Sequence, residues 1–323
     1  MKKYIGCDLG GTNLRAGIVD LENGEISHLT SIPTQAREGH EAVMDRMAGL
    51  LKDIITQSGL EQEDFGGIGI GVPGRLDLKR GRVVFLPNLP GTWPDVPLAD
   101  TIQQKTNLPV YLLNDVRAIT YGEWKFGAGR GANTIACFAI GTGIGGGLVI
   151  NGKLHLGIGG TAGELGHQTI DMNGPVCGCG NRGCLEVYAS GPAIAAMGMK
   201  AVVQGLTTLI GEYAEYDLNK ITPELVCRAA LEGDPVAKDI YERAGTCLGI
   251  GISNVIVSIG PRRVIIGGGV SQAGELLLEP ARRTIKERVT IMPVEEVEVV
   301  LAALGNDAGV LGVAAWAAER RRE

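Results

Sequence analysis

The sequence has no excess of basic charge. Lys and Arg together number 30 against 36 Asp and Glu, so the 323-residue chain carries a formal net charge of −6. Proteins that bind nucleic acid nonspecifically neutralise phosphates with clustered cations, and this composition does not favour such clusters. We expect no nucleic-acid partner.

Long apolar runs are also missing. The N-terminus is basic, but Asp8 interrupts the apolar stretch that a secretory signal would need. The two longest uncharged windows, residues 131–152 and 244–261, contain Asn-Gly and Gly-Pro turn signals. They therefore differ from a continuous membrane span of ~20 apolar residues. The sequence predicts a soluble, cytoplasmic chain with no membrane partner.

Glycine, in contrast, is abundant, with 50 residues in the chain. That fraction is roughly twice the usual ~7%, and the glycines gather in a few loops. They predict places where the backbone comes close to a ligand. A chain of 323 residues with 45% hydrophobic residues is long enough for two packed lobes.

One pattern of strands and turns occurs twice along the chain. Each copy has a strand, a Gly/Thr-rich turn, a returning strand, and a third strand. The strands of the two copies are predicted over residues 4–9, 13–19 and 25–29, and over residues 134–140, 148–150 and 153–156. Residues 141–147 form the predicted turn of the second copy. The repeat indicates two related lobes.

The remaining elements predict an α/β protein, because strands alternate with helices. Helices are predicted over residues 41–58, 236–257 and 307–320, and further strands over residues 67–72, 110–113 and 263–266. We expect a small lobe over residues 1–114, completed by a C-terminal helix at 305–323, and a large lobe over residues 115–304.

The two glycine-rich turns are candidates for phosphate binding. Consecutive backbone N–H groups can hold phosphate oxygens, and Thr hydroxyls add donors. Neither turn matches the Walker or dinucleotide-binding pattern, and either alone is equally consistent with a simple tight turn. Two turns in equivalent places favour one nucleotide shared by both lobes. The candidate residues are Asp8, Gly10, Gly11, Thr12, Asn13, Gly141, Thr142, Gly143 and Gly145.

With these turns the sequence resembles the sugar-kinase, actin and heat-shock ATPase superfamily. The resemblance implies two ribonuclease-H-like lobes with a nucleotide and sugar cleft between them. It implies a third nucleotide turn that includes Gly268 and Gly269. It also implies that Asp8 lies near the Mg²⁺ of MgATP, although a turn-capping aspartate is the alternative.

Asn114 and Asp115 follow a short strand and are predicted to lie at the cleft. A carboxylate there could take the proton of an attacking hydroxyl, which phosphoryl transfer requires beyond positioning and charge neutralisation. An Asn-Asp pair after a strand is also an ordinary helix cap or turn.

Three cysteines and a histidine predict a structural zinc site. Cys177, Cys179 and Cys184 lie within eight residues, and His167 precedes them. Such a Cys₃His set supplies four ligands and leaves no open position on the metal. The metal would hold one imidazole nitrogen and direct the other toward a substrate hydroxyl. Glu164 and Glu186 bracket this block and could accept hydrogen bonds from further hydroxyls.

The block Glu-x-Gly-His followed by Cys-x-Cys-Gly-x-x-Gly-Cys-x-Glu resembles the ROK family of repressors, open reading frames and kinases. Repressors of the family carry an N-terminal helix-turn-helix, whereas here the first phosphate strand begins at residue 4, so we expect a member of the kinase branch. Glucokinases are the commonest kinases with this pattern. The resemblance implies transfer from MgATP to the 6-hydroxyl of glucose, with Asp115 as general base. Sugar contacts are implied for Asn114, Glu164, His167 and Glu186.

Two weaker sugar contacts are Gly74 and Asn88; the gap between Asn88 and Trp93 is slightly longer than the family pattern. Aromatic residues make up only 4% of the chain, so sugar recognition should rest on polar hydrogen bonds. The open alternatives are a kinase for N-acetylmannosamine, N-acetylglucosamine, allose or fructose, a polyphosphate donor, and a non-catalytic sugar sensor. The resemblance also implies a homodimer or homotetramer.

Overall fold

The computed structural model describes residues 2–86, 89–90 and 93–322, and the chain forms two compact units. The first unit contains Met1–Ala132, Lys153–Gly163 and Ala303–Glu323, and the second contains Asn133–Gly152 and Glu164–Ala302. No helix in the described ranges is both long and apolar enough to cross a membrane.

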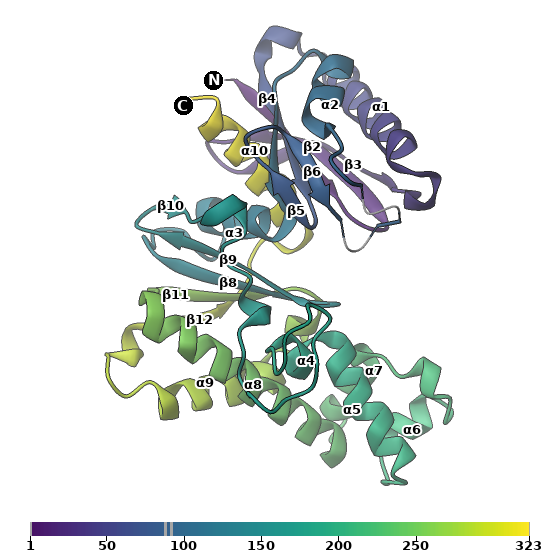
Figure 1. Ribbon diagram of the computed structural model, residues 1–323, viewed down its shortest axis with the longest axis vertical. Coiled ribbons are helices and arrows are strands. Elements are labelled where there is room, and N and C mark those ends of the chain that lie inside the picture. Colours follow the sequence, from purple (N-terminus) through teal and green to yellow (C-terminus); the bar gives the residue numbers. More distant parts are fainter. Residues whose placement is uncertain (1, 87–88, 91–92, 323) are drawn as a thin grey trace. The chain divides into compact units, whose positions relative to one another are not determined.

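The first unit is built on a five-stranded sheet with the order β3-β2-β1-β4-β7 (Figure 1). β1 pairs antiparallel with β2 and parallel with β4, and β4 pairs parallel with β7. The predicted opening meander is therefore present. The strands span Lys3–Leu9 (β1), Asn13–Asp20 (β2), Glu25–Pro33 (β3), Phe65–Val72 (β4) and Val110–Asn114 (β7).

Helices cover both faces of this sheet. The apolar side chains of Ile5 and Cys7 belong to the core beneath α1 (His40–Ser58) and α2 (Leu98–Thr106). On the other face Gly6 and Gly69 allow α10 (Ala308–Arg320) to approach closely, because a Cβ at either position would overlap the backbone of α10. A small hairpin of β5 (Arg75–Asp77) and β6 (Arg82–Phe85) follows β4.

The second sheet repeats this topology, with five strands in the order β10-β9-β8-β11-β12. β8 pairs antiparallel with β9 and parallel with β11, and β11 pairs parallel with β12, as their counterparts do in the first sheet. The predicted duplication is thus confirmed. The strands span Ile135–Ile140 (β8), Ile144–Ile150 (β9), Arg263–Gly267 (β11) and Glu298–Leu301 (β12), and β10 is Lys153–Leu154.

The long helix α8 (Pro235–Ile259) organises the core of the second unit. Asp234 caps its N-terminus by accepting a hydrogen bond from the backbone N–H of Ala237 at 2.7 Å, and Gly260 ends it in a left-handed conformation. Helix α9 (Glu275–Arg288) packs along it. The shorter helices of this unit are α4 (Glu186–Ala189), α5 (Gly191–Val203), α6 (Leu209–Tyr213) and α7 (Pro223–Leu231).

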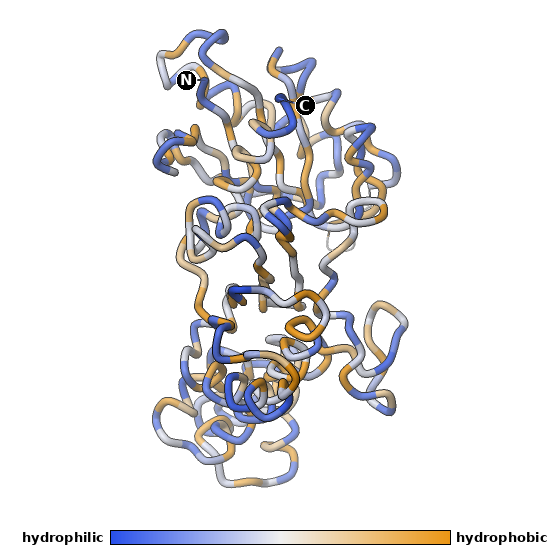
Figure 2. Tube along the Cα trace, turned by 90° about the vertical axis from the view of Figure 1, so that its left-hand side faces the viewer, coloured by the Kyte–Doolittle hydropathy of each residue, from blue (hydrophilic) through white to orange (hydrophobic). Residues whose placement is uncertain are grey.

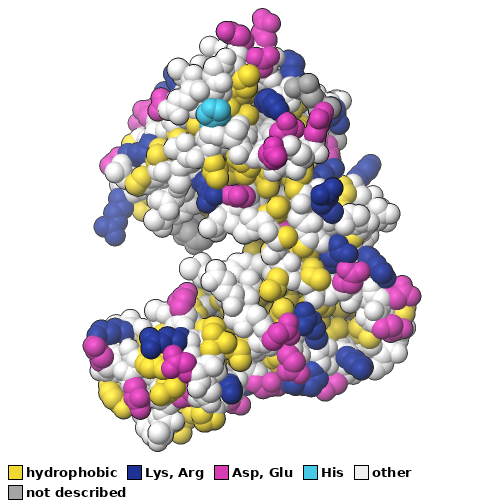
Figure 3. Space-filling view, turned by 180° about the vertical axis from the view of Figure 1, so that it is seen from behind, with side chains coloured by type: hydrophobic (Ala, Val, Ile, Leu, Met, Phe, Trp, Pro, Cys, Tyr) yellow, Lys and Arg dark blue, Asp and Glu magenta, His cyan; other side chains and the backbone are white. Residues whose placement is uncertain are grey.

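Polar and apolar residues alternate along many helices of both units, as Figure 2 shows. Amphipathic helices of this kind bury one face against a sheet and leave the other to solvent. On the face seen in Figure 3, basic and acidic side chains are interspersed over each unit. The mixture agrees with the low net charge.

The division between the units differs from the predicted boundary at residues 114 and 115. Helix α3 (Asp115–Phe126) belongs to the first unit, where it packs against α10. Gly122 of α3 and Gly312 of α10 make this contact close, since a Cβ at either would overlap the backbone of the other helix. This contact joins segments about 190 residues apart in the sequence, and local patterns do not reveal it.

Candidate functional site

The turn between β1 and β2 presents its tip to solvent. The backbone N–H of Gly10 donates to the carbonyl of Asn13 at 2.9 Å, and Thr34 fixes the turn through Gly10 and Thr12. Gly11, Thr12 and Asn13 are exposed. A Cβ on Gly11 would meet no atom within 4 Å, so this glycine is not required by packing within the described chain. Because Gly11 has no side chain, there is room for a ligand beside the turn.

Asp8 lies at the end of β1 in a confined position. A Cβ at Gly71 or at Gly309 would come to 3.0 Å from one of its carboxylate oxygens. Burial and the negative charge of Asp115 raise the pKa of Asp8 to about 7, while Arg15 acts in the opposite direction. The negative charges of Asp8 and Asp115 therefore repel each other.

Asn114 and Asp115 lie where β7 ends and α3 begins. The side-chain oxygen of Asn114 accepts hydrogen bonds from the backbone N–H groups of Val116 at 3.1 Å and Arg117 at 3.3 Å. Its amide nitrogen donates to the carbonyl of Gly74 at 3.2 Å. The helix-cap interpretation is thus confirmed for Asn114. The cap places Asp115 in the first turn of α3, where the helix dipole favours a carboxylate.

The equivalent turn of the second unit joins β8 to β9. The backbone N–H of Gly141 donates to the carbonyl of Gly143 at 2.9 Å, and Thr142 is exposed. The predicted turn over residues 141–147 is too long: β9 already begins at Ile144, and Gly145 pairs with Ala139 in the ladder. Gly145 is therefore a strand residue.

Gly268 and Gly269 follow β11. Gly268 has a φ of 87°, and a Cβ there would overlap the backbone of Ile140, so only glycine fits. Gly269 has open space around it and borders a cavity of about 370 Å³. Sequence reasoning missed this cavity, because its other walls come from one face of α7, from Tyr241 of α8 and from the turn after Gly269, which only the fold brings together. Its lining includes Glu224, Cys227, Arg228, Tyr241, Val270 and Gln272.

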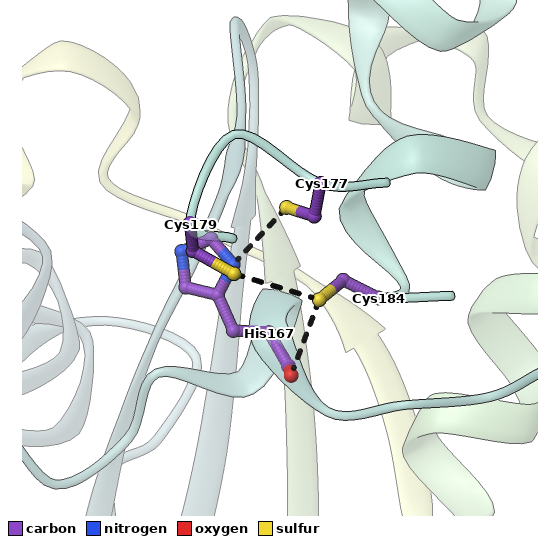
Figure 4. Close-up of side chains that lie close together, drawn as sticks. All are labelled: His167, Cys177, Cys179 and Cys184. Carbon is purple, nitrogen blue, oxygen red and sulfur yellow. Dashed lines mark hydrogen bonds between the residues drawn. The ribbon is translucent and has the colours of Figure 1, made fainter. Parts of the chain in front are cut away.

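The predicted metal ligands converge in the second unit (Figure 4). The donor atoms of His167, Cys177, Cys179 and Cys184 all lie within 4.8 Å of one another. The Sγ atoms of Cys179 and Cys184 are 3.7 Å apart, as are the Cys177 Sγ and the His167 Nδ1. Ligands of a tetrahedral zinc ion lie about 3.8 Å apart, whereas disulfide-bonded sulfurs lie about 2 Å apart. The residues present fit a four-coordinate metal.

The surroundings of Cys184 favour its neutral form. Burial raises the pKa of this thiol to about 12, so a bound cation would be needed to hold it as a thiolate. The Nδ1 atom of His167 faces Cys177, and the other ring nitrogen points away from the sulfurs (Figure 4). A metal in this cluster would fix the imidazole orientation and leave Nε2 available to a ligand.

The two predicted glutamates differ in their surroundings. Glu164 is exposed, and it precedes the short turn that contains His167. Glu186 begins α4, and one of its carboxylate oxygens accepts a hydrogen bond from the backbone N–H of Ile144 at 2.9 Å. Its other oxygen lies 3.7 Å from the Cys177 Sγ. Glu186 thus joins the second glycine-rich turn to the cysteine cluster.

The structure brings the candidate residues together in two sets. The first unit holds Asp8, Gly74, Asn114, Asp115 and the first turn, and the second holds the cysteine cluster, Glu186 and the later glycines. Asn88 lies outside the described residues. Sequence reasoning did not single out Arg117, which is buried beside Asn114 and Asp115.

The ROK family model matches residues 4–320 of the chain. The glucokinase of Thermotoga maritima is 38% identical over 318 residues, which cover 98% of both chains. The crystal structure of a ROK family glucokinase from Streptomyces griseus, in complex with glucose and AMPPNP, is 34% identical with a TM-score of 0.82 and covers 98% of this chain and 99% of its own. The xylose repressor of Bacillus subtilis is 33% identical; the match covers 96% of this chain and 75% of the repressor.

Proposed function

The chain belongs to the ROK family, and on this premise we propose that it is an ATP-dependent glucokinase that transfers the γ-phosphoryl group of MgATP to the 6-hydroxyl of glucose. The similarity to glucokinases extends over nearly the whole chain, and the S. griseus relative was solved with glucose and AMPPNP. The first unit also carries a carboxylate at the N-terminus of a capped helix. That carboxylate is the observation on which the chemistry rests.

Asp115 is the proposed general base. The cap by Asn114 fixes the first turn of α3, and Asp115 accepts the proton of the 6-hydroxyl as that oxygen attacks the γ-phosphorus. Asp8 is proposed to lie near the Mg²⁺ that accompanies ATP and neutralises the phosphate charges. Its partial burial and its raised pKa suit a carboxylate that becomes ionised when a cation binds.

The glycine-rich turns are proposed to hold the phosphates through backbone N–H groups, with Gly10, Gly11, Thr12 and Asn13 in one unit and Gly141, Thr142 and Gly143 in the other. The cavity beside Gly269 has the size of a small-molecule site and suits the adenosine of the nucleotide. Gly145 is not expected to touch the nucleotide, because it pairs within the sheet.

Sugar binding is proposed to rest on polar groups. Nε2 of His167 would contact one hydroxyl, with its direction set by a structural zinc ion on Nδ1, Cys177, Cys179 and Cys184. Glu164, Glu186, Asn114 and the backbone of Gly74 would hold the remaining hydroxyls. We further propose a cytoplasmic enzyme that forms a homodimer or homotetramer.

The test is a panel of hexoses with coupled detection of ADP. Glucose should give the highest kcat/KM; a higher value for N-acetylmannosamine, N-acetylglucosamine, allose or fructose would replace glucose in the proposal. Substituting polyphosphate for ATP tests the identity of the phosphoryl donor.

The role of Asp115 is tested by substitution. Production of glucose 6-phosphate from ATP should fall at least about 100-fold in Asp115→Asn, since a general base contributes roughly 10²–10⁴ in rate.

A sugar sensor is the second candidate, because the similarity to the xylose repressor of B. subtilis covers 96% of this chain. A sensor would bind sugar equally in the wild type and in Asp115→Ala and would show no turnover in either. Calorimetry of glucose binding beside the turnover assay separates the two functions. Turnover that is lost in Asp115→Ala while the thermal midpoint is unchanged would exclude the sensor.

A further inference from the structure

One buried cation of the first unit has no part in the chemistry described above. Arg117 lies on α3, two residues after Asp115, and is only 2% exposed. Its guanidinium donates to three oxygens: the side-chain oxygen of Asn114 at 2.9 Å, the carbonyl of Thr161 at 3.0 Å and the carbonyl of Ala162 at 3.0 Å. A planar guanidinium with five donors can make these contacts at once, whereas a lysine ammonium cannot match that geometry.

The segment held by Arg117 is unusually rich in glycine. Residues 157–163 contain four glycines with positive φ, between 61° and 91°, and the side chain of Ile158 is 95% exposed. Glycine loses more backbone entropy on ordering than any other residue. The hydrogen bonds within this segment and to Leu156 are local turn contacts. Among the described residues, Arg117 supplies the side-chain hydrogen bonds that tie it to a helix.

This segment leads directly into Glu164, which is proposed to contact the sugar. Glu164 follows Ala162 after a single residue, Gly163, which has a φ of 91°. The position of the Ala162 carbonyl therefore limits where the Glu164 backbone can begin. Since Arg117 also binds Asn114, one guanidinium fixes two places in the chain from which proposed sugar contacts extend.

Arg117 acts together with the helix cap to determine which atom Asn114 can offer to a ligand. A guanidinium carries only donors, so the atom that faces it must be the amide oxygen. That oxygen already accepts from two backbone N–H groups, and the amide nitrogen donates to Gly74. An amide nitrogen has a second N–H, which has no partner in the described part of the chain. Asn114 is thus set to donate a hydrogen bond to a hydroxyl oxygen.

We propose that Arg117 is a positioning residue for sugar recognition: it orders the glycine-rich segment before Glu164 and holds the Asn114 amide in its donating orientation. The proposal rests on the glucokinase function proposed above. It predicts that removing the guanidinium raises the KM for the sugar far more than the KM for ATP. The reason is that both groups it positions, Asn114 and Glu164, are proposed to contact the sugar.

The test is a double-mutant cycle on Arg117 and Glu164, with turnover and glucose binding both measured. Arg117→Met should raise the KM and the Kd for glucose by about 10-fold or more while the KM for ATP changes by less than about 3-fold. Arg117→Lys should show an intermediate loss. In a Glu164→Gln background, Arg117→Met should have a much smaller further effect on glucose, because coupled residues are not additive.

Glu123→Gln is the matched control. Glu123 is fully buried on the same helix, and its carboxylate accepts from the backbone N–H groups of Ala128 at 2.8 Å, Ala303 at 3.0 Å and Leu304 at 2.8 Å. Its substitution should lower the thermal midpoint without changing the ratio of the two KM values. If Arg117→Met merely lowers the midpoint as this control does, or if the cycle is additive, the inference is wrong.

Three provisions keep the outcome interpretable and separate from that of the proposed function. If Arg117→Met does not fold, Arg117→Lys replaces it throughout the cycle. If the wild type prefers another hexose, the cycle is run with that sugar. If it has no turnover at all, the glucokinase proposal fails, and the glucose Kd values from calorimetry still decide whether Arg117 and Glu164 are coupled.

Discussion

The carboxylates of Asp8 and Asp115 repel each other within the first unit. After burial, the charge of Asp115 is the second cause that raises the pKa of Asp8 to about 7, and Arg15 only partly compensates. Two carboxylates that repel each other are a common arrangement in sites that bind a cation. The repulsion has a measurable consequence for stability.

The first prediction concerns Asp8→Asn and pH. Between pH 4 and pH 7 folded Asp8 keeps a proton that the unfolded chain releases, so the stability of the ligand-free protein falls as pH rises through this window and then levels off. Asn carries no charge, so the variant should be more stable than the wild type at pH 8. We expect a gain of about 1–3 kcal/mol, because one pKa unit is worth ~1.4 kcal/mol and partial exposure screens the charge.

Urea unfolding at pH 4.5, 6 and 8, without nucleotide or divalent cations, measures this difference. The gain should be smallest at pH 4.5. An equal gain or loss at all three pH values would show that Asp8 does not titrate in this range.

The second prediction concerns the cysteine cluster. Cys179→Ser removes one of four ligands and should reduce bound zinc from about one equivalent to a small fraction. Because the metal would orient His167, glucose affinity should fall with the zinc content, by roughly 10-fold or more. Metal analysis and calorimetry on the same preparation measure both quantities.

Cys247→Ser is the control for this experiment. Cys247 is a free, half-buried cysteine on α8 that does not belong to the cluster. It should retain both zinc and glucose affinity. A Cys179→Ser protein that lacks zinc but binds glucose normally would refute the coupling between metal and sugar.

The third prediction compares two neighbouring glycines. Gly268→Ala places a Cβ into the backbone of Ile140 at a φ of 87°, so it should destabilise the protein by about 2 kcal/mol or more. Gly269→Ala meets no atom within 4 Å and should leave stability nearly unchanged. Since Gly269 borders the cavity proposed for adenosine, its substitution should raise the KM for ATP.

Thermal unfolding and steady-state kinetics separate these effects. A Gly269→Ala protein with unchanged stability and unchanged KM for ATP would place the nucleotide elsewhere.

Features with a local signature could be predicted from the sequence. The meanders follow from strand patterns joined by glycine-rich turns, and their shared topology confirms the duplication. The Cys₃His cluster follows from spacing alone, and the cap at Asn114 follows from an Asn after a strand. In each case neighbouring residues determine the structure.

Features that depend on distant contacts could not be predicted. Helix α3 joins the first unit because Gly122 and Gly312 let it pack against α10, far along the chain. Arg117 binds backbone carbonyls, which every residue possesses, so no side-chain pattern marks its partners. Gly145 belongs to a strand because β8 supplies a ladder for it, although glycine runs usually indicate turns.

The position of α10 sets an order of events during synthesis. This helix covers the sheet face on which Gly6 and Gly69 lie, yet the ribosome makes it only after the whole second unit. The first sheet is complete at Asn114, and α10 cannot cover its face until about 190 further residues have been translated. The second unit can complete its own core earlier, so the N-terminal half of this protein is the last to finish folding.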